Sequence, residues 1–241
     1  MPRFFLPSVE GDTLEVTGQD AVHIRRALRM AAGDDVTVCD GRGTDCACVI
    51  DGFDGDAVRL RVTARRPSAT EPSVAVTLYQ GLPKADKMEW IIQKAVELGV
   101  TRIVPVQTAR CVALVTDDAR AAKKAARWQK IADEAAGQSG RGILPVVEPP
   151  IAFRDAAARL REEYTVVCYE GGGEPLPALA GRDTAALSLV IGPEGGFDPR
   201  EVETLRDGGA KVATLGPRIL RCETAPLAAL AVLMAATGNM A

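Results

Sequence analysis

The sequence predicts an α/β fold class with two domains: a small N-terminal β-barrel and a larger C-terminal domain built on a parallel sheet. Short apolar runs separated by turn dipeptides fill residues 1 to about 66. From Val74 onward, strand-like runs alternate with helical periodicity, which is typical of a parallel sheet covered by helices. The segment RRPSATEPS between the two patterns has the composition of a linker. We therefore predict domains at residues 1–70 and 74–241.

In the N-terminal part, the predicted strands lie in the runs FFL, VTVCDGRG, CACVIDGFDGD and VRLRVTARR. Three dipeptides predict the turns between strands: Asp40-Gly41, Asp51-Gly52 and Asp54-Gly55. Apolar residues alternate with arginine in VRLRV, as in a half-buried strand. The stretch HIRRALRMAAGD instead predicts a short helix whose apolar face holds Ile24, Ala27 and Leu28.

In the C-terminal part, the predicted strands are VAVTLYQG, RIVPVQ, ILPVVE, TVVCYE, LSLVIG and AKVATLG. Helices are expected over about 84–98 and 117–137, from about 152, from about 199, and at the C-terminal end. The first of these carries apolar residues at core spacing: Met88, Ile91, Ile92, Ala95 and Val96. The last helix is apolar on all sides, so we expect it in the core or at a dimer interface.

Composition excludes several classes of protein. The 241 residues are 47% hydrophobic and 25% charged, as in an ordinary globular enzyme, and no apolar run is long enough to cross a bilayer. With no signal sequence at the N-terminus, we expect a cytoplasmic protein. The single histidine, His23, rules out a histidine metal cluster and disfavours a Ser-His-Asp hydrolase. The six cysteines have no C-x-x-C spacing, so we expect buried thiols and no metal site.

Three glycine-containing loops follow predicted strands: YEGGGEP, GPEGGF and LGPRIL. None matches a Walker A loop or a G-x-G-x-x-G fingerprint, which disfavours a phosphate-driven nucleotide enzyme. Together they suit a nucleoside bound by backbone groups and an apolar wall. Each loop taken singly is equally consistent with an ordinary strand-to-helix turn, with Asp198 as N-cap and Pro199 as the first helical residue.

Several long motifs of the chain resemble those of one known family, and they occur in the same order as in that family. They are RFFL, HIRRALRMAAGDDVTVCDGRG, GLPKADKMEWIIQKAVELGV, RWQKIADEAAGQSGR, LVIGPEGGFDPREVE and LGPRILRCETAPLAAL. Together they cover nearly the whole chain and resemble the 16S ribosomal RNA uridine N3-methyltransferase family of the SPOUT superfamily. The chain departs from the family's pattern at Cys222, where threonine is expected, and at Pro226.

The resemblance implies a PUA-like RNA-binding barrel followed by a SPOUT methyltransferase domain with a deep C-terminal trefoil knot. It also implies a homodimer and transfer of a methyl group from S-adenosylmethionine to N3 of uridine 1498 in the 16S rRNA of the small ribosomal subunit. The residues that the resemblance assigns to the methyl donor are Tyr169, Glu170, Ile191, Gly192, Pro193, Glu194, Gly195, Leu215, Gly216, Ile219 and Leu220. Glu170 is expected either to bond a ribose hydroxyl or to occupy a turn.

Methyl transfer from a sulfonium needs alignment and charge control, but no enzyme nucleophile. The expected catalytic residues are Arg218, Arg221 and Glu223. The arginines would stabilise charge on the base oxygens or contact a phosphate. Glu223 is expected to orient an arginine, to cap the last helix or to accept the N3 proton, and an acid in the first turn of a helix also has a purely dipolar explanation.

The residues predicted to contact RNA are Arg3, Arg25, Arg26, Arg29, Lys84 and Lys87. Without the resemblance, a charged helix face is more simply explained as solvated surface. Two other functions stay open at this point. One is a ribosome-binding assembly factor that keeps the knot but has no transfer activity, and the other is an α/β enzyme that acts on a small molecule.

Overall fold

The computed structural model describes residues 2–112 and 117–240. The chain divides into two compact units, Met1–Glu71 with Ala136–Leu144, and Pro72–Ala135 with Pro145–Ala241. The break after Glu71 falls in the segment predicted as a linker. The grouping of Ala136–Leu144 with the first unit is a feature that strand and helix alternation does not predict.

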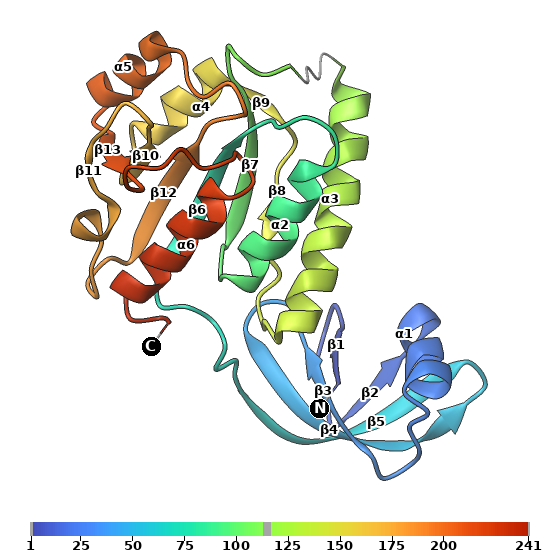
Figure 1. Cartoon of the computed structure of the whole chain (residues 1–241). Coiled ribbons are helices and arrows are strands. Elements are labelled where there is room, and N and C mark those ends of the chain that lie inside the picture. The colour runs from blue at the N-terminus through green and yellow to red at the C-terminus, as the bar shows by residue number, and fades with distance from the viewer. Residues whose placement is uncertain (1, 113–116, 241) are drawn as a thin grey trace. The chain divides into compact units, whose positions relative to one another are not determined.

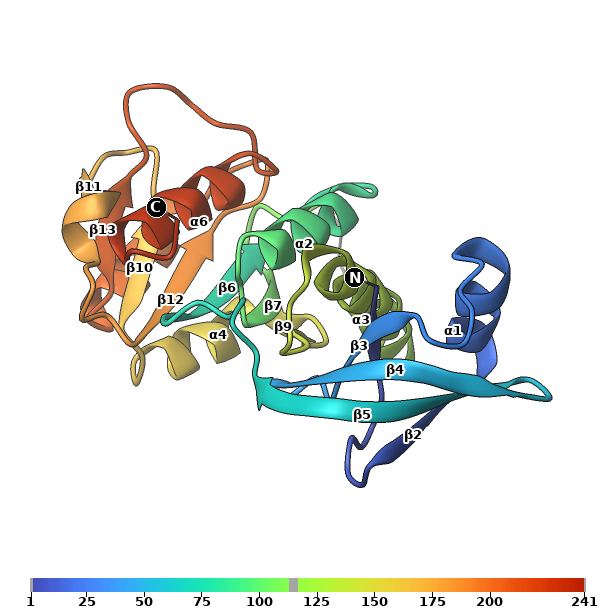
Figure 2. The same cartoon turned by 90° about the horizontal axis from the view of Figure 1, so that it is seen from below.

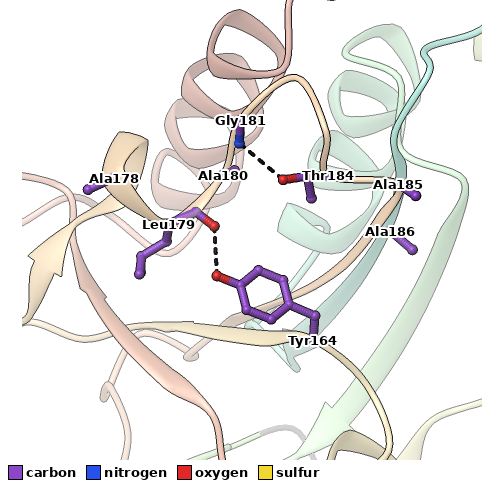
Figure 3. A pocket seen from close by; sticks show the side chains of 8 residues that line it. All are labelled: Tyr164, Ala178, Leu179, Ala180, Gly181, Thr184, Ala185 and Ala186. Carbon is purple, nitrogen blue, oxygen red and sulfur yellow. Dashed lines mark hydrogen bonds between the residues drawn. The ribbon is translucent and has the colours of Figure 1, made fainter.

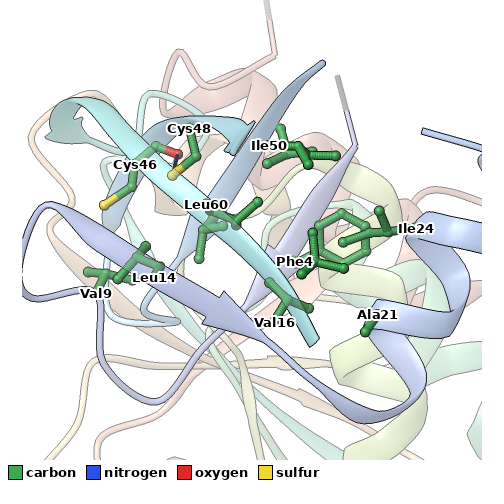
Figure 4. Packing of buried hydrophobic residues seen from close by; sticks show 13 residues of the cluster. Phe4, Val9, Leu14, Val16, Ala21, Ile24, Cys46, Cys48, Ile50 and Leu60 are labelled. Carbon is green, nitrogen blue, oxygen red and sulfur yellow. Dashed lines mark hydrogen bonds between the residues drawn. The ribbon is translucent and has the colours of Figure 1, made fainter. Parts of the chain in front are cut away.

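The first unit contains a five-stranded sheet in the order β1-β3-β4-β5-β2. The strands are β1 (Arg3–Phe5), β2 (Thr13–Val16), β3 (Asp35–Cys39), β4 (Thr44–Asp54) and β5 (Ala57–Pro67). β1 runs parallel to β3, and the other pairs are antiparallel. Side chains from one face of the sheet and from the helix beside it form an apolar core, which includes Phe4, Leu14, Ile24, Ile50 and Leu60 (Figure 4).

Two of the three predicted turns in this unit are confirmed. Asp40-Gly41 lies between β3 and β4, and Asp54-Gly55 begins the connection from β4 to β5. The prediction for Asp51-Gly52 is wrong, because both residues lie inside β4 where the pairing with β5 shifts register between Ile50 and Gly52. A strand can hold an extra residue as a bulge without turning back.

The predicted helix near His23 has a different geometry. It consists of α1 (Gly18–Val22) followed by one π-helical segment, η1 (His23–Ala27), in which the Leu28 N–H donates to the His23 carbonyl at 3.0 Å. Ile24 is fully buried as predicted, but Ala27 and Leu28 are exposed. A wider turn rotates later residues off the core-facing side, so the 3.6-residue period fails here.

The second unit is built on an eight-stranded sheet in which every strand pair is parallel. Its main order is β11-β13-β10-β12-β6-β7-β8, and β9 also pairs with β7. The strands are β6 (Ala75–Gly81), β7 (Arg102–Gln107), β8 (Val146–Val147), β9 (Ile151–Ala152), β10 (Thr165–Cys168), β11 (Glu174–Pro175), β12 (Ala186–Ile191) and β13 (Lys211–Thr214). The predicted parallel sheet is therefore confirmed.

Helices cover both faces of this sheet (Figures 1 and 2). They are α2 (Lys87–Glu97), α3 (Asp118–Ser139), α4 (Phe153–Leu160), the 3-10 turn η2 (Leu176–Leu179), α5 (Pro199–Asp207) and α6 (Ala225–Ala236). Residues of α4 and α5 pack in one cluster with Tyr79, Val104 and Val190 of the strands. On the other face, α2 packs against α6, and all five predicted core residues of α2 are buried.

The final helix, α6, is only partly enclosed. Its buried residues are Pro226, Ala229, Leu230, Leu233 and Met234. Leu227, Ala228, Ala231 and Val232 stay partly exposed, which leaves a second apolar strip on the same helix. Among the described residues, no helix is both long and apolar enough to span a membrane.

Candidate functional site

A pocket of about 830 Å³ lies in the second unit, where β10, β12 and β13 end. These strands are neighbours and run parallel, so their carboxyl ends meet at one edge of the sheet. Three loops follow them and line the pocket, at 168–172, 191–197 and 214–222, together with Ala225 of α6. This is the edge at which ligands bind in open parallel sheets.

The loop at 191–197 depends on two close approaches. A Cβ atom on Gly81, at the end of β6, would lie 2.6 Å from both the nitrogen and the Cδ of Pro193, so only glycine lets the strand reach this loop. Gly196 has φ +64°, and a Cβ there would lie 2.5 Å from Oε1 of Glu170. The Glu170 side chain therefore lies against this loop within the pocket lining.

The same loop is fixed at its far end by a capping box. The Arg200 N–H donates to the Asp198 side chain at 3.0 Å, and the Asp198 N–H donates to Glu201 at 3.0 Å. Pro199 is the first helical residue, as predicted. The other carboxylate oxygen of Glu201 accepts from the Ala109 N–H at 2.8 Å, which ties the loop after β7 to α5.

The loop at 214–222 presents the two predicted catalytic arginines. Arg218 and Arg221 both line the pocket and are exposed, and neither side chain has a hydrogen bond or ion pair with any of the described residues. Ile219 between them is 79% exposed. Two unpaired guanidinium groups beside an open pocket are available to an anionic ligand.

Charged groups from three segments meet beside this loop. The Lys87 ammonium lies 3.2 Å from Glu194 and 3.1 Å from Glu223. The thiol of Cys222 donates to Glu223 at 3.1 Å, and this bond, together with Lys87, holds the pKa of Glu223 below its ordinary value. Burial and the Glu223 carboxylate raise the pKa of Cys222 to about 12, so it stays a neutral thiol.

The structure brings the predicted donor-site residues together, because all eleven line this one pocket, as do Arg218 and Arg221. Glu223 is not among the lining residues and lies next to it. Among the described residues, Glu223 has no arginine partner, and α6 has no side-chain cap at its first turn. The lining residues that sequence reasoning missed are Cys168, Gly171, Gly172, Gly196, Phe197, Thr214, Pro217, Cys222 and Ala225. All but Ala225 lie in or next to the three loops, so taking each loop as a whole would have found them.

The residues predicted to contact RNA have different surroundings. In the first unit, Arg26 and Arg29 are exposed, whereas Arg25 lies with its guanidinium carbon 4.9 Å from the centroid of the Phe53 ring and donates to the Ala57 carbonyl. Arg3 is 13% exposed and forms an ion pair with Asp45 at 2.7 Å. In the second unit, Lys84 is exposed.

A second, shallower hollow of about 510 Å³ lies near the start of β12 (Figure 3). Its main polar groups already have partners within the chain. The Tyr164 hydroxyl donates to the Leu179 carbonyl at 2.8 Å, and the Gly181 N–H donates to the Thr184 hydroxyl at 3.0 Å (Figure 3). We assign no ligand to it.

Comparison with known proteins gives consistent matches. Residues 70–234 match the model of an RNA methyltransferase domain, and residues 16–63 match that of an RNA methyltransferase PUA domain. The chain is 37% identical to ribosomal RNA small subunit methyltransferase E of Bacillus subtilis over 97% of its length and 96% of the relative. It is 35% identical to the protein of that name from Mycobacterium bovis, over 91% of this chain and 85% of the relative.

A solved structure is similar over both units. It is the crystal structure of a ribosomal RNA small subunit methyltransferase E from Neisseria gonorrhoeae bound to S-adenosyl methionine. The TM-score is 0.88 at 33% sequence identity, with 98% of this chain and 97% of that chain covered.

Proposed function

Since the chain belongs to the RNA methyltransferase family that includes the ribosomal RNA small subunit methyltransferase E proteins, we propose that it methylates 16S rRNA with S-adenosylmethionine as donor. The proposed target is N3 of one uridine, uridine 1498 in the family, on small ribosomal subunits in the cytoplasm. The observation that carries the proposal is the pocket formed by the three loops that follow β10, β12 and β13.

The pocket's chemistry suits this donor. Ile191, Leu215 and Leu220 supply apolar surface for an adenine ring, and the glycine-rich backbone supplies N–H and C=O groups without bulky side chains. Glu170 lies against Gly196 in the pocket lining, and its carboxylate would accept a hydrogen bond from a ribose hydroxyl. The donor would supply a methyl group activated by the positive charge on sulfur.

The two arginines are suited to stabilise the negative charge that develops on the uracil during methyl transfer. Loss of the N3 proton spreads negative charge over the uracil oxygens, and a guanidinium near those oxygens favours the anion. Arg218 and Arg221 have the exposure that such a contact needs, since neither is tied to another of the described side chains. We assign one or both to the target base or its phosphate.

Glu223 is better suited to positioning than to accepting the proton. Its lowered pKa keeps it ionised near neutral pH, but it also makes the carboxylate a weak base. Its contacts are with Lys87 and Cys222.

For RNA binding, the proposal relies on Arg25, Arg26 and Arg29 of the first unit and on Lys84 of the second. Phosphate contacts by exposed cations should make RNA affinity fall steeply with salt. Arg3 and Lys87 are already engaged in ion pairs with carboxylates, so phosphate contact by these two stays a prediction that competes with those pairs.

We also propose a homodimer and a trefoil knot in the C-terminal part of the second unit, both as the family resemblance implies. The partly exposed apolar strip of α6 supports the dimer, because contiguous apolar surface on a soluble domain favours a protein interface.

The test is methyl transfer from labelled S-adenosylmethionine to small subunits that lack the modification, with the product nucleoside identified by mass spectrometry. We expect label in N3-methyluridine at one site and its loss in Arg221→Ala. The matched control is Arg154→Ala, because Arg154 is an exposed arginine of the same unit with its side chain paired to Asp155. Label in another base would discard the target, and donor binding without transfer would indicate a non-catalytic binding protein.

A further inference from the structure

A single lysine joins two of the pocket's loops. Lys87 stands at the first position of α2, and its ammonium contacts Glu194 at 3.2 Å and Glu223 at 3.1 Å. Glu194 belongs to the loop after β12, and Glu223 follows the loop after β13. Both carboxylates therefore come from segments more than a hundred residues away in sequence from the cation that holds them.

Each carboxylate has a second contact that fixes its direction. The Lys84 backbone N–H lies 3.1 Å and 3.3 Å from the two oxygens of Glu194, and the Cys222 thiol donates to the same oxygen of Glu223 that Lys87 contacts. Hydrogen bonds with Glu223 and then Glu194 raise the pKa of Lys87. The pKa values of Glu223 and Glu194 are lowered and that of Lys87 is raised, so all three groups are charged at neutral pH.

The middle of the loop that Glu223 anchors has no backbone hydrogen-bond donors that are satisfied within the described residues. No described residue accepts a hydrogen bond from the backbone N–H of Arg218, Ile219 or Leu220. The first regular bonds after it are those from the Thr224 and Ala225 N–H groups to the Arg221 carbonyl. Side-chain anchors at the end of such a loop decide where its backbone lies.

The cluster is also a poor site for phosphate. Two carboxylates and one ammonium leave one net negative charge at this place, and an ammonium with two anionic partners gains little from a third. The geometry therefore disfavours a direct phosphate contact by Lys87.

We propose that Lys87 is a positioning residue, which holds the loop at 214–222 against the loop at 191–197 and so sets the shape of the donor pocket and the place of Arg221. The proposal rests on the proposed function in one respect, namely that this pocket binds S-adenosylmethionine. The mechanical part, that Lys87 orders the last loop, is independent of any ligand.

The variants are Lys87→Met, which keeps the length of the side chain but removes its charge, and Lys87→Arg, which restores the charge. The matched control is Lys94→Met, since Lys94 lies two turns further along α2 and pairs with Glu97 at 2.7 Å, away from the pocket lining. Glu223→Gln removes the ion pair with Lys87 by changing the carboxylate instead of the lysine. It replaces Lys87→Met in the test if that variant folds poorly. Melting temperature verifies that each variant is folded.

Hydrogen exchange of the ligand-free protein tests the mechanical part. We expect faster exchange of the amides at 216–224 in Lys87→Met and Glu223→Gln, with wild-type exchange in Lys94→Met and near wild-type exchange in Lys87→Arg. Unchanged exchange at 216–224 in both Lys87→Met and Glu223→Gln would overturn the proposal. This readout stands even if the wild-type protein binds no S-adenosylmethionine, a result that would refute the proposed function instead.

Donor binding and kinetics test the consequence. For Lys87→Met we expect the Kd and the KM for S-adenosylmethionine to rise about tenfold, with the KM for the small subunit unchanged. Lys87→Arg should recover most of the loss. A raised KM for the subunit, with weaker salt dependence and unchanged donor affinity, would identify Lys87 as a phosphate contact and refute the positioning role. A fall in kcat with unchanged donor affinity and unchanged exchange at 216–224 would place Lys87 on the reacting base, which also contradicts it.

Discussion

The close approach of β6 to the loop at 191–197 makes Gly81 the most informative single position in the pocket's framework. In Gly81→Ala, the new methyl carbon would meet two atoms of Pro193 at 2.6 Å and the carbonyl carbon of Gly192 at 2.9 Å. All three are backbone or ring atoms, so no side chain can rotate away. Either the end of the strand or the loop must move by several tenths of an ångström.

The size of the effect follows from that overlap. Forcing one extra methyl group into a packed site costs about 1–3 kcal/mol. Where the loop moves, this cost appears in donor binding, and the affinity for S-adenosylmethionine should fall by roughly 5- to 150-fold. Where the strand moves, the cost appears in the free energy of unfolding, because the end of β6 is paired with both β7 and β12.

Isothermal titration calorimetry with S-adenosylmethionine, together with thermal unfolding, separates the two cases. The control is Gly181→Ala, because a Cβ at Gly181 would have no neighbour within 4 Å and that glycine has no positive φ. We expect the control to match the wild type in both measurements. If Gly81→Ala also matched the wild type in both, the close approach at Pro193 would have no consequence and the reasoning from it would be refuted.

Three further predictions concern other parts of the chain. In the first unit, Arg141 is 3% exposed and pairs with Glu71, so Glu71→Ala should lower the free energy of unfolding by about 3 kcal/mol in urea denaturation. Burial alone would raise the pKa of Glu71, but Arg141 and two backbone N–H groups outweigh it and lower the pKa. This contribution is therefore present above the ordinary value of 4.5 and is lost as pH falls through the lowered pKa; acid unfolding that is identical in wild type and Glu71→Ala would contradict it. In the second unit, burial and then Glu163 raise the pKa of Tyr79 to about 12, so a spectrophotometric titration should show a tyrosine that ionises near pH 12 and is missing in Tyr79→Phe, which should also cost about 1 kcal/mol in stability. Replacing Arg25, Arg26 and Arg29 together by glutamine should reduce the slope of log affinity for RNA against log salt by about 2, and an unchanged slope would remove these arginines from the interface.

Much of the fold follows from local sequence. The strands β6, β7, β10 and β12 are mostly buried apolar runs, and α2 has a regular apolar stripe, so periodicity alone locates them. The two-residue strands β9 and β11 were not predicted, and β11 is exposed. The capping box at Asp198 and Glu201 is likewise visible in four residues of sequence. The eleven predicted donor-site residues come from loops that follow adjacent parallel strands, and for that reason they line one pocket.

Periodicity failed where the backbone departs from a regular repeat. The π-helical segment at His23–Ala27 moves Ala27 and Leu28 out of the core, and the register shift in β4 turns a predicted turn into part of a strand. Gly52 is consistent with a bulge as well as with a turn, so the Asp51-Gly52 dipeptide does not decide between the two. The partly exposed strip of α6 is another feature that periodicity does not predict, because the helix is apolar on all sides.

Residue type and spacing along the chain suffice to predict the longer strands and helices of the second unit and the three glycine loops, and the single histidine excludes a histidine metal cluster. Only the tertiary structure decided that Lys87 pairs with Glu194 and Glu223, that Arg3 pairs with Asp45, and that Arg218 and Arg221 stay unpaired among the described residues. The physical reason is that Coulomb interactions depend on distance in space. A lysine and a carboxylate more than a hundred residues apart in sequence meet only after the sheet has brought their loops to one edge.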